Sequence, residues 1–220
     1  MKKVLLTIIA TMLMFGSAYA QPSFTIGLGM NQGVFAAEGK ETNNDEGGSV
    51  QSTTTEYGAF KDSYPSIYLE VGNDVGSIGI SLQDDLDTPQ NVNERGAGPS
   101  DDSNPTSKVS GSFEDVITVY GLVNMPYNLY AKAGLVMGDI ISNETQKSGN
   151  SYGNADLDGY VIGFGYQHEA DQANIRFEIL GHSYDDVSFN NNVAASGNRN
   201  VIDISDMIGA SAQISINKTF

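Results

Sequence analysis

The end of the chain alternates strictly between apolar and polar side chains and stops on an aromatic residue. One face carries the apolar residues Ile208, Ala210, Ala212, Ile214, Ile216 and Phe220, with Lys218 as its single charge. The opposite face is small and polar, and a period of two residues is typical of a β-strand. Nothing on that polar face is large enough to build the core of a soluble protein. The segment therefore predicts a strand of a membrane barrel, apolar toward lipid and polar toward the lumen.

The first twenty residues have the layout of an export signal. Lys2 and Lys3 precede an apolar run from Val4 to Phe15, and small residues stand before Gln21. The run is shorter than the ~20 residues that a helix needs to span hydrocarbon. We therefore expect residues 1–20 to be a signal peptide cleaved after Ala20, and residues 21–220 to form one barrel domain.

Seven earlier segments alternate in the same way. Their apolar faces are Phe24, Ile26, Leu28 and Met30; Ile67, Leu69 and Val71; Ile78, Ile80 and Leu82; Ile117 and Val119; Leu129, Ala131, Ala133, Leu135 and Met137; Tyr160, Ile162, Phe164 and Tyr166; and Ile175, Phe177 and Ile179. The alternation is weakest in the fourth segment, where we expect Thr118 and Tyr120 to face inward. With the last segment the sequence predicts eight strands, and an even number allows an antiparallel up-and-down transmembrane β-barrel to close with both termini on one side.

The connections between these segments alternate in length. Three are short, at Gly72–Gly76, Asn124–Asn128 and His168–Ala173. Four are long and polar, at Ala36–Ser63, Asp84–Ser112, Ile141–Asp156 and Tyr184–Val201. Outer-membrane barrels have short periplasmic turns and longer extracellular loops, so this order predicts which end faces the outside. We expect these connections to be loops. Biased runs within them lack the apolar residues needed to fold alone and are expected to be mobile, namely Glu41–Glu46, Gly47–Gly48, Ser52–Thr55, Asn190–Asn192 and Gly197–Asn200.

Charged residues fall on the predicted inward faces. Glu70, Lys132, Arg176 and Glu178 have this register, and Glu114 joins them if the fourth strand is read correctly. An eight-stranded barrel is only wide enough for side chains to fill it, so these groups should meet one another. Because the two signs are both present, we expect a salt-bridged plug across the lumen. The alternative is a narrow path for ions.

Composition excludes several classes of function. The chain has 27 Asp and Glu against 11 Lys and Arg, for a formal net charge of −16. Nucleic acid is therefore not an expected partner, because phosphate binding needs clustered basic residues. There is no cysteine, which removes disulfides and thiolate metal sites. No motif predicts a cofactor.

Four segments together resemble the small outer-membrane barrels of the OmpA, OmpX and opacity-protein type. They are the signal end Ser17–Ala20, the first strand Phe24–Met30, the segment Gly159–Tyr166 and the closing Ile214–Phe220. The resemblance implies residence in the outer membrane of a Gram-negative bacterium with both termini periplasmic. It also implies that the barrel-assembly machinery and periplasmic chaperones read Ile214, Ile216 and Phe220 during biogenesis.

The pair His182 and Ser183 is the candidate for catalysis. It resembles the site of outer-membrane lipid A deacylases, in which one residue separates the His from the Ser, but here the two residues are adjacent. Neighbouring side chains on a strand point to opposite faces, so the two can act as base and nucleophile only at a strand end or bulge. The alternative is a polar pair at the barrel mouth.

Acidic runs offer hard oxygen ligands. Asp156 and Asp158, and likewise Asp84, Asp85 and Asp87, provide ligands of the kind that calcium accepts. Neither run has the full spacing of a calcium-binding loop, so solvated acidic surface is the reading we prefer, and no metal site is predicted.

These observations predict a monomeric outer-membrane barrel that is not an enzyme. Its acidic loops would serve envelope integrity or surface interaction, with outer-membrane lipid and an extracellular partner as the molecules it contacts. A lipid-modifying enzyme using His182 and Ser183 and a narrow pore for ions or small solutes remain as alternatives.

Overall fold

The computed structural model describes residues 22–45, 47–88, 91–93, 107–145, 152–191 and 199–220. The predicted signal peptide and its cleavage site lie outside these residues. Among the described residues, no helix is long and apolar enough to cross a membrane.

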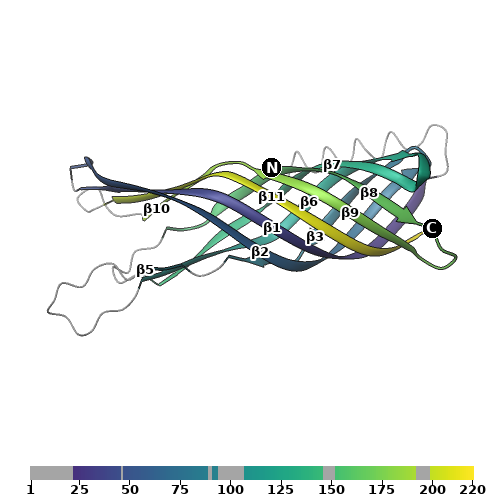
Figure 1. Cartoon of the computed structure of the whole chain (residues 1–220), viewed down its shortest axis with the longest axis horizontal. Helices are drawn as coiled ribbons and strands as arrows, with labels where there is room; N and C mark the ends of the chain where they lie inside the picture. Colours follow the sequence, from purple (N-terminus) through teal and green to yellow (C-terminus); the bar gives the residue numbers. More distant parts are fainter. Residues whose placement is uncertain (1–21, 46, 89–90, 94–106, 146–151, 192–198) are drawn as a thin grey trace.

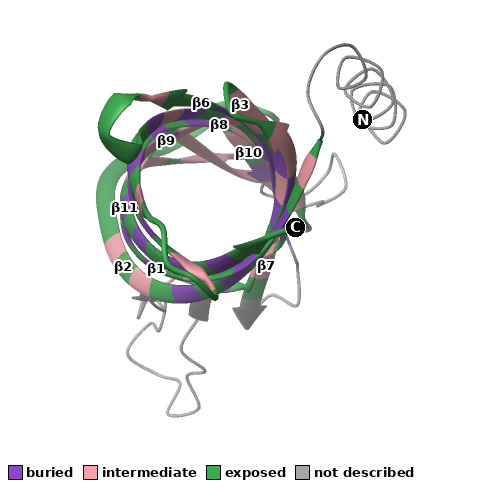
Figure 2. Ribbon diagram, turned by 90° about the vertical axis from the view of Figure 1, so that its right-hand side faces the viewer, coloured by how far each residue is buried: buried purple, intermediate pink, exposed green. Residues whose placement is uncertain are grey.

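The described chain forms an antiparallel ring of eight strands (Figures 1 and 2). The ring follows the chain as β1 (Ser23–Asn44), β2 (Val50–Asn73), β3 (Gly76–Gln83), β6 (Ser107–Met125), β7 (Leu129–Thr145), β8 (Ala155–His168), β9 (Asn174–Tyr184) and β11 (Arg199–Thr219), and β11 pairs with β1 to close it. Short segments β4 (Leu86–Asp87) and β5 (Asn91–Asn93) pair with β6, and β10 (Val187–Asn190) pairs with β11. The predicted all-β eight-stranded barrel is confirmed.

The faces of the strands follow the predicted alternation. Ile179 is 74% exposed on the outside of β9, whereas its neighbours Glu178 and Leu180 are buried inside. On β11, Ile214 and Ile216 are exposed beside Met30 and Leu28 of β1, and Ser215 is buried. Figure 2 shows the barrel along its axis with buried and exposed positions alternating along the strands. Along these parts of the strands, apolar side chains face outward and mostly polar side chains face the lumen. This alternation is typical of barrels that span a membrane.

The three short connections all lie at one end, which we call the short-turn end (Figure 1). The side chain of Asn73 accepts hydrogen bonds from the backbone N–H groups of Val75 and Gly76 and so forms the tight turn between β2 and β3. A 3-10 turn, η1 (Pro126–Asn128), joins β6 to β7. Phe220 exchanges two backbone hydrogen bonds with Phe24, so the C-terminus lies at this end too.

The opposite end differs from the sequence prediction, which made all four long connections loops. β1 and β2 stay paired as far as Asn44 and Val50, so most of the predicted connection Ala36–Ser63 is a β-hairpin. Parts of the other three predicted connections are also strands, since β6 pairs with β7 up to Thr145 and β10 pairs with β11. The reason is that paired strands satisfy each other's backbone N–H and C=O groups whether their outer side chains are apolar or polar. The pairing can therefore continue beyond the apolar belt. We call this end the hairpin end.

Two β-bulges interrupt the ring at comparable places. On β6, Asp115 and Val116 stand opposite one residue of β7, and on β11, Asp206 and Met207 stand opposite one residue of β1. Both aspartates have positive φ, 53° and 51°, a conformation that Asp tolerates better than most side chains. Each bulge adds one residue and therefore exchanges the inward and outward faces of its strand toward the hairpin end.

The bulge on β6 corrects one expected site residue. Thr118 and Tyr120 face inward as predicted, with Val119 sharing the outer face of Leu135. Beyond the bulge, Phe113 pairs with the buried Ile140, and Glu114 therefore lies on the outer face opposite Asp139. Glu114 is not a member of the lumen charges, because the extra residue reverses the register that the sequence alternation implied.

Candidate functional site

Four charged residues meet inside the barrel toward the short-turn end. Arg176 donates from Nη1 to Glu70 Oε1 at 2.6 Å and from Nη2 to Oε2 at 2.9 Å. Lys132 Nζ contacts Glu178 Oε2 at 2.8 Å. All four side chains are at least nine-tenths buried. We call this group, contributed by β2, β7 and β9, the ionic septum.

Tyrosines complete the hydrogen bonding of the septum. Tyr120 donates to Glu70 Oε1 at 2.9 Å, and Tyr130 donates to Glu178 Oε1 at 2.7 Å. Every carboxylate oxygen of the septum therefore accepts a hydrogen bond, as a buried charge requires. Lys132 Nζ also lies 4.1 Å from the centre of the Tyr120 ring, within range of a cation–π contact.

Glycines on the inner wall make room for these tyrosines. A methyl group added at Gly165 would overlap the ring of Tyr130, and one at Gly79 would overlap the ring of Tyr120. Two large rings can thus lie flat against the wall of a barrel that is only eight strands wide.

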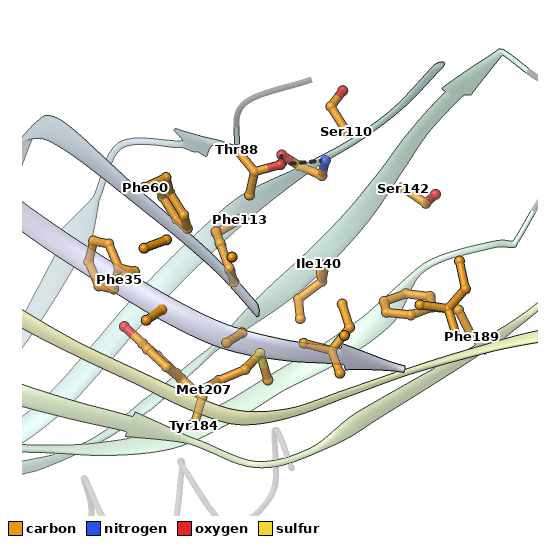
Figure 3. Close-up of a pocket in the computed structure, with 18 of the residues that line it drawn as sticks. Phe35, Phe60, Thr88, Ser110, Phe113, Ile140, Ser142, Tyr184, Phe189 and Met207 are labelled. Atoms are coloured by element: carbon orange, nitrogen blue, oxygen red, sulfur yellow. Dashed lines mark hydrogen bonds between the residues drawn. The ribbon is translucent and has the colours of Figure 1, made fainter. Parts of the chain in front are cut away.

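The hairpin end of the lumen is apolar, which the sequence reasoning missed. A cavity of about 460 Å³ opens there, lined by residues of most strands of the ring (Figure 3). Its lining includes Phe35, Phe60, Phe113, Ile140, Tyr184, Phe189, Ile202, Ile204 and Met207. We call this cavity the apolar pocket. Its volume falls within the ~300–1,000 Å³ range of small-molecule sites.

Four aromatic rings from four strands form a closed circuit at this pocket. The ring centres of Phe35 and Phe60 are 5.3 Å apart, those of Phe60 and Phe113 are 6.0 Å apart, and Tyr184 lies within 6.5 Å of both Phe113 and Phe35. These distances fit favourable aromatic pairs. These side chains come from β1, β2, β6 and β9, and β6 is separated in the barrel from β2 by β3 and from β9 by β7 and β8. The aromatic contacts therefore extend across the lumen.

The bulges explain why the pocket is apolar. On β11, Ile208 faces outward, but beyond Asp206 and Met207 the residues Ile202 and Ile204 pack against the buried core. The apolar face of the strand is thus lipid-facing on one side of the bulge and lumen-facing on the other. The available signal was the apolar pair Ile202 and Ile204 with Phe189, which stand inside segments that we assigned to polar loops.

A second cavity, of about 580 Å³, lies at the short-turn end. Glu70 and Arg176 contribute to its wall together with residues of the turns, such as Asn73 and Asp171. The ionic septum therefore stands between a polar vestibule at this end and the apolar pocket at the other.

The structure does not bring His182 and Ser183 together. His182 is buried in the lumen and bonds through Nε2 to Ser211 Oγ at 2.8 Å, and its Nδ1 has no hydrogen-bond partner among the described residues. Ser183 pairs with Tyr160 and Ile208, two residues exposed on the outer face. The strand is regular at this point, so the two side chains take opposite faces.

The residues proposed as an assembly signal lie on the outer face of β11 and directly after its end. Ile214, Ile216 and Phe220 are all exposed, and Lys218 Nζ lies 5.7 Å from the centre of the Phe220 ring. Within the described ranges, no group of three or more His, Asp or Glu side chains is placed to hold a metal ion.

Comparison with known proteins supports the fold. No protein-family model matches the chain, and no curated sequence matches it. The outer membrane protein OprG of Pseudomonas aeruginosa is similar in structure, with a TM-score of 0.52 and 12% identity over 91% of this chain and 98% of that one. Neisserial surface protein A matches with a TM-score of 0.38 and 9% identity over 86% of this chain and 97% of that one. The chain has the fold of the small outer-membrane β-barrel proteins.

Proposed function

We propose that this protein is a non-enzymatic outer-membrane barrel that binds a small apolar molecule in the outer half of its lumen. The observation that carries the proposal is the apolar pocket, whose lining is mostly aromatic and aliphatic. Lumen surface that only faced water would be expected to be polar, as it is in the vestibule at the other end. Apolar lining with few polar groups is typical of ligand sites.

The aromatic circuit supports the same proposal. Phe60 and Phe113 offer ring faces and edges to a ligand, and Met207 offers a flexible side chain that adapts to its shape. The rings come from separate strands of a closed barrel, so their positions are fixed before a ligand arrives. A preformed site loses less free energy on binding than a loop that must first become ordered.

The septum argues against passage of ions or solutes along the barrel axis. Opening it would require breaking the contacts of Arg176 with Glu70 and of Lys132 with Glu178. This would leave buried charges without partners, which costs several kcal/mol of free energy. We therefore expect a binding protein with one entrance at the hairpin end instead of a pore. The separation of His182 from Ser183 likewise argues against a hydrolytic site built on that pair.

Binding is testable with a neutral fluorescent probe, 1-naphthalenemethanol. The full barrel domain is refolded and placed in nanodiscs of zwitterionic lipid, and the fluorescence anisotropy of the probe is measured against empty nanodiscs. We expect saturable binding that Ala37→Phe abolishes, because Ala37 lines the pocket and the larger ring fills it. Ala212→Phe adds the same volume on the exposed outer face and should leave binding unchanged. Binding that ignores Ala37→Phe contradicts the proposal.

Surface interaction is a second proposed function, favoured by the hairpin of β1 and β2. This hairpin projects beyond the ring (Figure 1), and its turn is organised by Asp45, which accepts hydrogen bonds from Gly47 and Ser49. An ordered hairpin loses little conformational entropy when it meets a partner. A pull-down of an extracellular partner that is lost on replacing residues 44–50 by a two-residue turn would support it.

We further propose that both termini are periplasmic and that the protein is a monomer. The orientation is supported by the short turns and the paired ends Phe24 and Phe220, which share one end of the barrel. A monomer is supported by the pairing of β11 with β1, which closes the ring within one chain. On this orientation, Phe220 and the exposed Ile214 and Ile216 would be read by periplasmic chaperones and by the barrel-assembly machinery.

A further inference from the structure

One charged residue lines the apolar pocket. Among its described lining residues, Glu56 is the only one with a charged side chain. It pairs with Gly39 of β1, which in turn pairs with Ile204 of β11, a residue packed against the buried core. Residues paired across strands share a face, so Glu56 belongs to the inner wall. Glu56 is four residues closer to the tip of the hairpin than Phe60. It therefore lies in the part of the pocket nearest the hairpin end, which we call the outer part of the pocket.

A second carboxylate lies close by on the same face. Glu41 pairs with Ile202 and accepts a hydrogen bond from Asn200 Nδ2 at 2.6 Å. The same amide group of Asn200 bonds to Tyr152, which lines the pocket. Glu41 and Glu56 are diagonal neighbours across β1 and β2, since Glu41 pairs with Thr54 and Gly39 with Glu56. Two carboxylates therefore lie toward the hairpin end of the pocket, Glu56 in its lining and Glu41 next to it.

No described cation of the hairpin of β1 and β2 faces these carboxylates. Lys40 is adjacent to Gly39 and takes the opposite, outer face, and Lys61 pairs with the exposed Val34 on that same outer face. The buried cations of the barrel, Lys132 and Arg176, are already engaged in the septum. The acidic outer part of the pocket thus has no basic side chain of this hairpin to balance it.

From this arrangement we infer that the ligand is an amphiphilic organic cation. Its apolar body, aromatic or alkyl, fills the pocket against Phe60 and Phe113, and a single protonated amine or quaternary ammonium lies toward Glu56. A positive group near carboxylates gains Coulomb energy, whereas an anion at the same place is repelled. Aromatic rings add to the selection because their faces attract cations. The inference rests on the proposed binding function and names the class of molecule for the same pocket.

The test compares three probes of the same shape that differ in charge. They are 1-naphthylmethylamine, 1-naphthalenemethanol and 1-naphthoate, titrated into the barrel in zwitterionic nanodiscs with empty nanodiscs subtracted. We expect the amine to bind most tightly and the acid least tightly. The ratio of amine affinity to alcohol affinity should fall about 2- to 5-fold in Glu56→Gln, the size expected when an exposed charge pair is lost. The same ratio should shrink in high salt, because salt screens exposed charges.

The matched control is Glu38→Gln. Glu38 belongs to the same hairpin but pairs with Tyr57 and Ser205 on the outer face, so the amine-to-alcohol ratio should not change. An acid that binds as tightly as the amine, or a ratio that Glu56→Gln leaves unchanged, overturns the cation inference while the alcohol still shows a binding pocket. Absence of saturable binding for both amine and alcohol overturns the proposed function itself.

Discussion

Arg176 and Glu70 form a two-pronged ion pair across the lumen, with distances of 2.6 Å and 2.9 Å between guanidinium nitrogens and carboxylate oxygens. Arg176 also donates from Nε to Gln167 at 2.6 Å, so three of its donors are used. This geometry is the strongest that the two side chains can make. It links β9 to β2, which are separated in the ring by β11 and β1.

Removing Arg176 should destabilise the barrel strongly. Arg176→Ala leaves the carboxylate of Glu70 buried without its cation, and we expect a loss of about 3–5 kcal/mol in the free energy of unfolding. Urea unfolding followed by gel mobility measures this loss. Lys61→Ala, on an outward-facing lysine, is the control and should change the free energy by no more than about 0.5 kcal/mol.

The parent should show negligible conductance in planar bilayers. A nearly neutral Arg176→Ala together with a conducting parent would mean that the lumen is wet.

The outer face should reject charge in a way that depends on register. Ile214→Arg and Ile162→Arg place a guanidinium on the exposed apolar belt, and each should cost about 2–4 kcal/mol near the bilayer midplane. Ser215→Arg, one residue away, points into the lumen, where space and not lipid limits it. Folding into lipid vesicles at graded urea measures all three. Equal tolerance of the three substitutions would be incompatible with the assigned faces.

The bulge on β11 should depend on the backbone conformation of Asp206. Its φ of 51° is costly for a β-branched residue, so Asp206→Val should destabilise by about 1–2 kcal/mol. Asp206→Asn should be nearly neutral, because Asn adopts positive φ as readily and the side chain is exposed. The unfolding free energies of both variants, measured in the same detergent, are compared. If the two variants have the same free energy of unfolding, the backbone conformation of Asp206 is not what holds Met207 inside the barrel.

The orientation of the barrel is testable because the chain has no cysteine. Ser49→Cys lies in the exposed turn between β1 and β2, and Gln172→Cys lies in the exposed turn between β8 and β9. With periplasmic termini, a membrane-impermeant maleimide added to intact cells should label Ser49→Cys and spare Gln172→Cys. Permeabilising the outer membrane should make both reactive. Labelling of Gln172→Cys alone on intact cells would reverse the proposed topology.

The sequence predicts the barrel and the lumen charges because both follow from a period of two residues. Alternation in β9 places Ile175, Phe177 and Ile179 outside and Arg176 and Glu178 inside, without reference to any other strand. Short connections then force neighbouring segments to pair in antiparallel order. The same logic gives the separation of His182 from Ser183, since adjacent residues of a regular strand cannot share a face.

Only the tertiary structure decides what the hairpin end of the lumen contains. An extra residue at Asp115 and another at Asp206 reverse which face is inside, so Glu114 leaves the lumen and Ile204 enters it. A bulge of this kind depends on how a strand pairs with its neighbour, β7 in one case and β1 in the other, and the alternation within one strand carries no mark of it. The length of the hairpin from β1 to β2 is likewise set by continued backbone pairing, because polar side chains do not prevent a ladder from extending beyond the membrane.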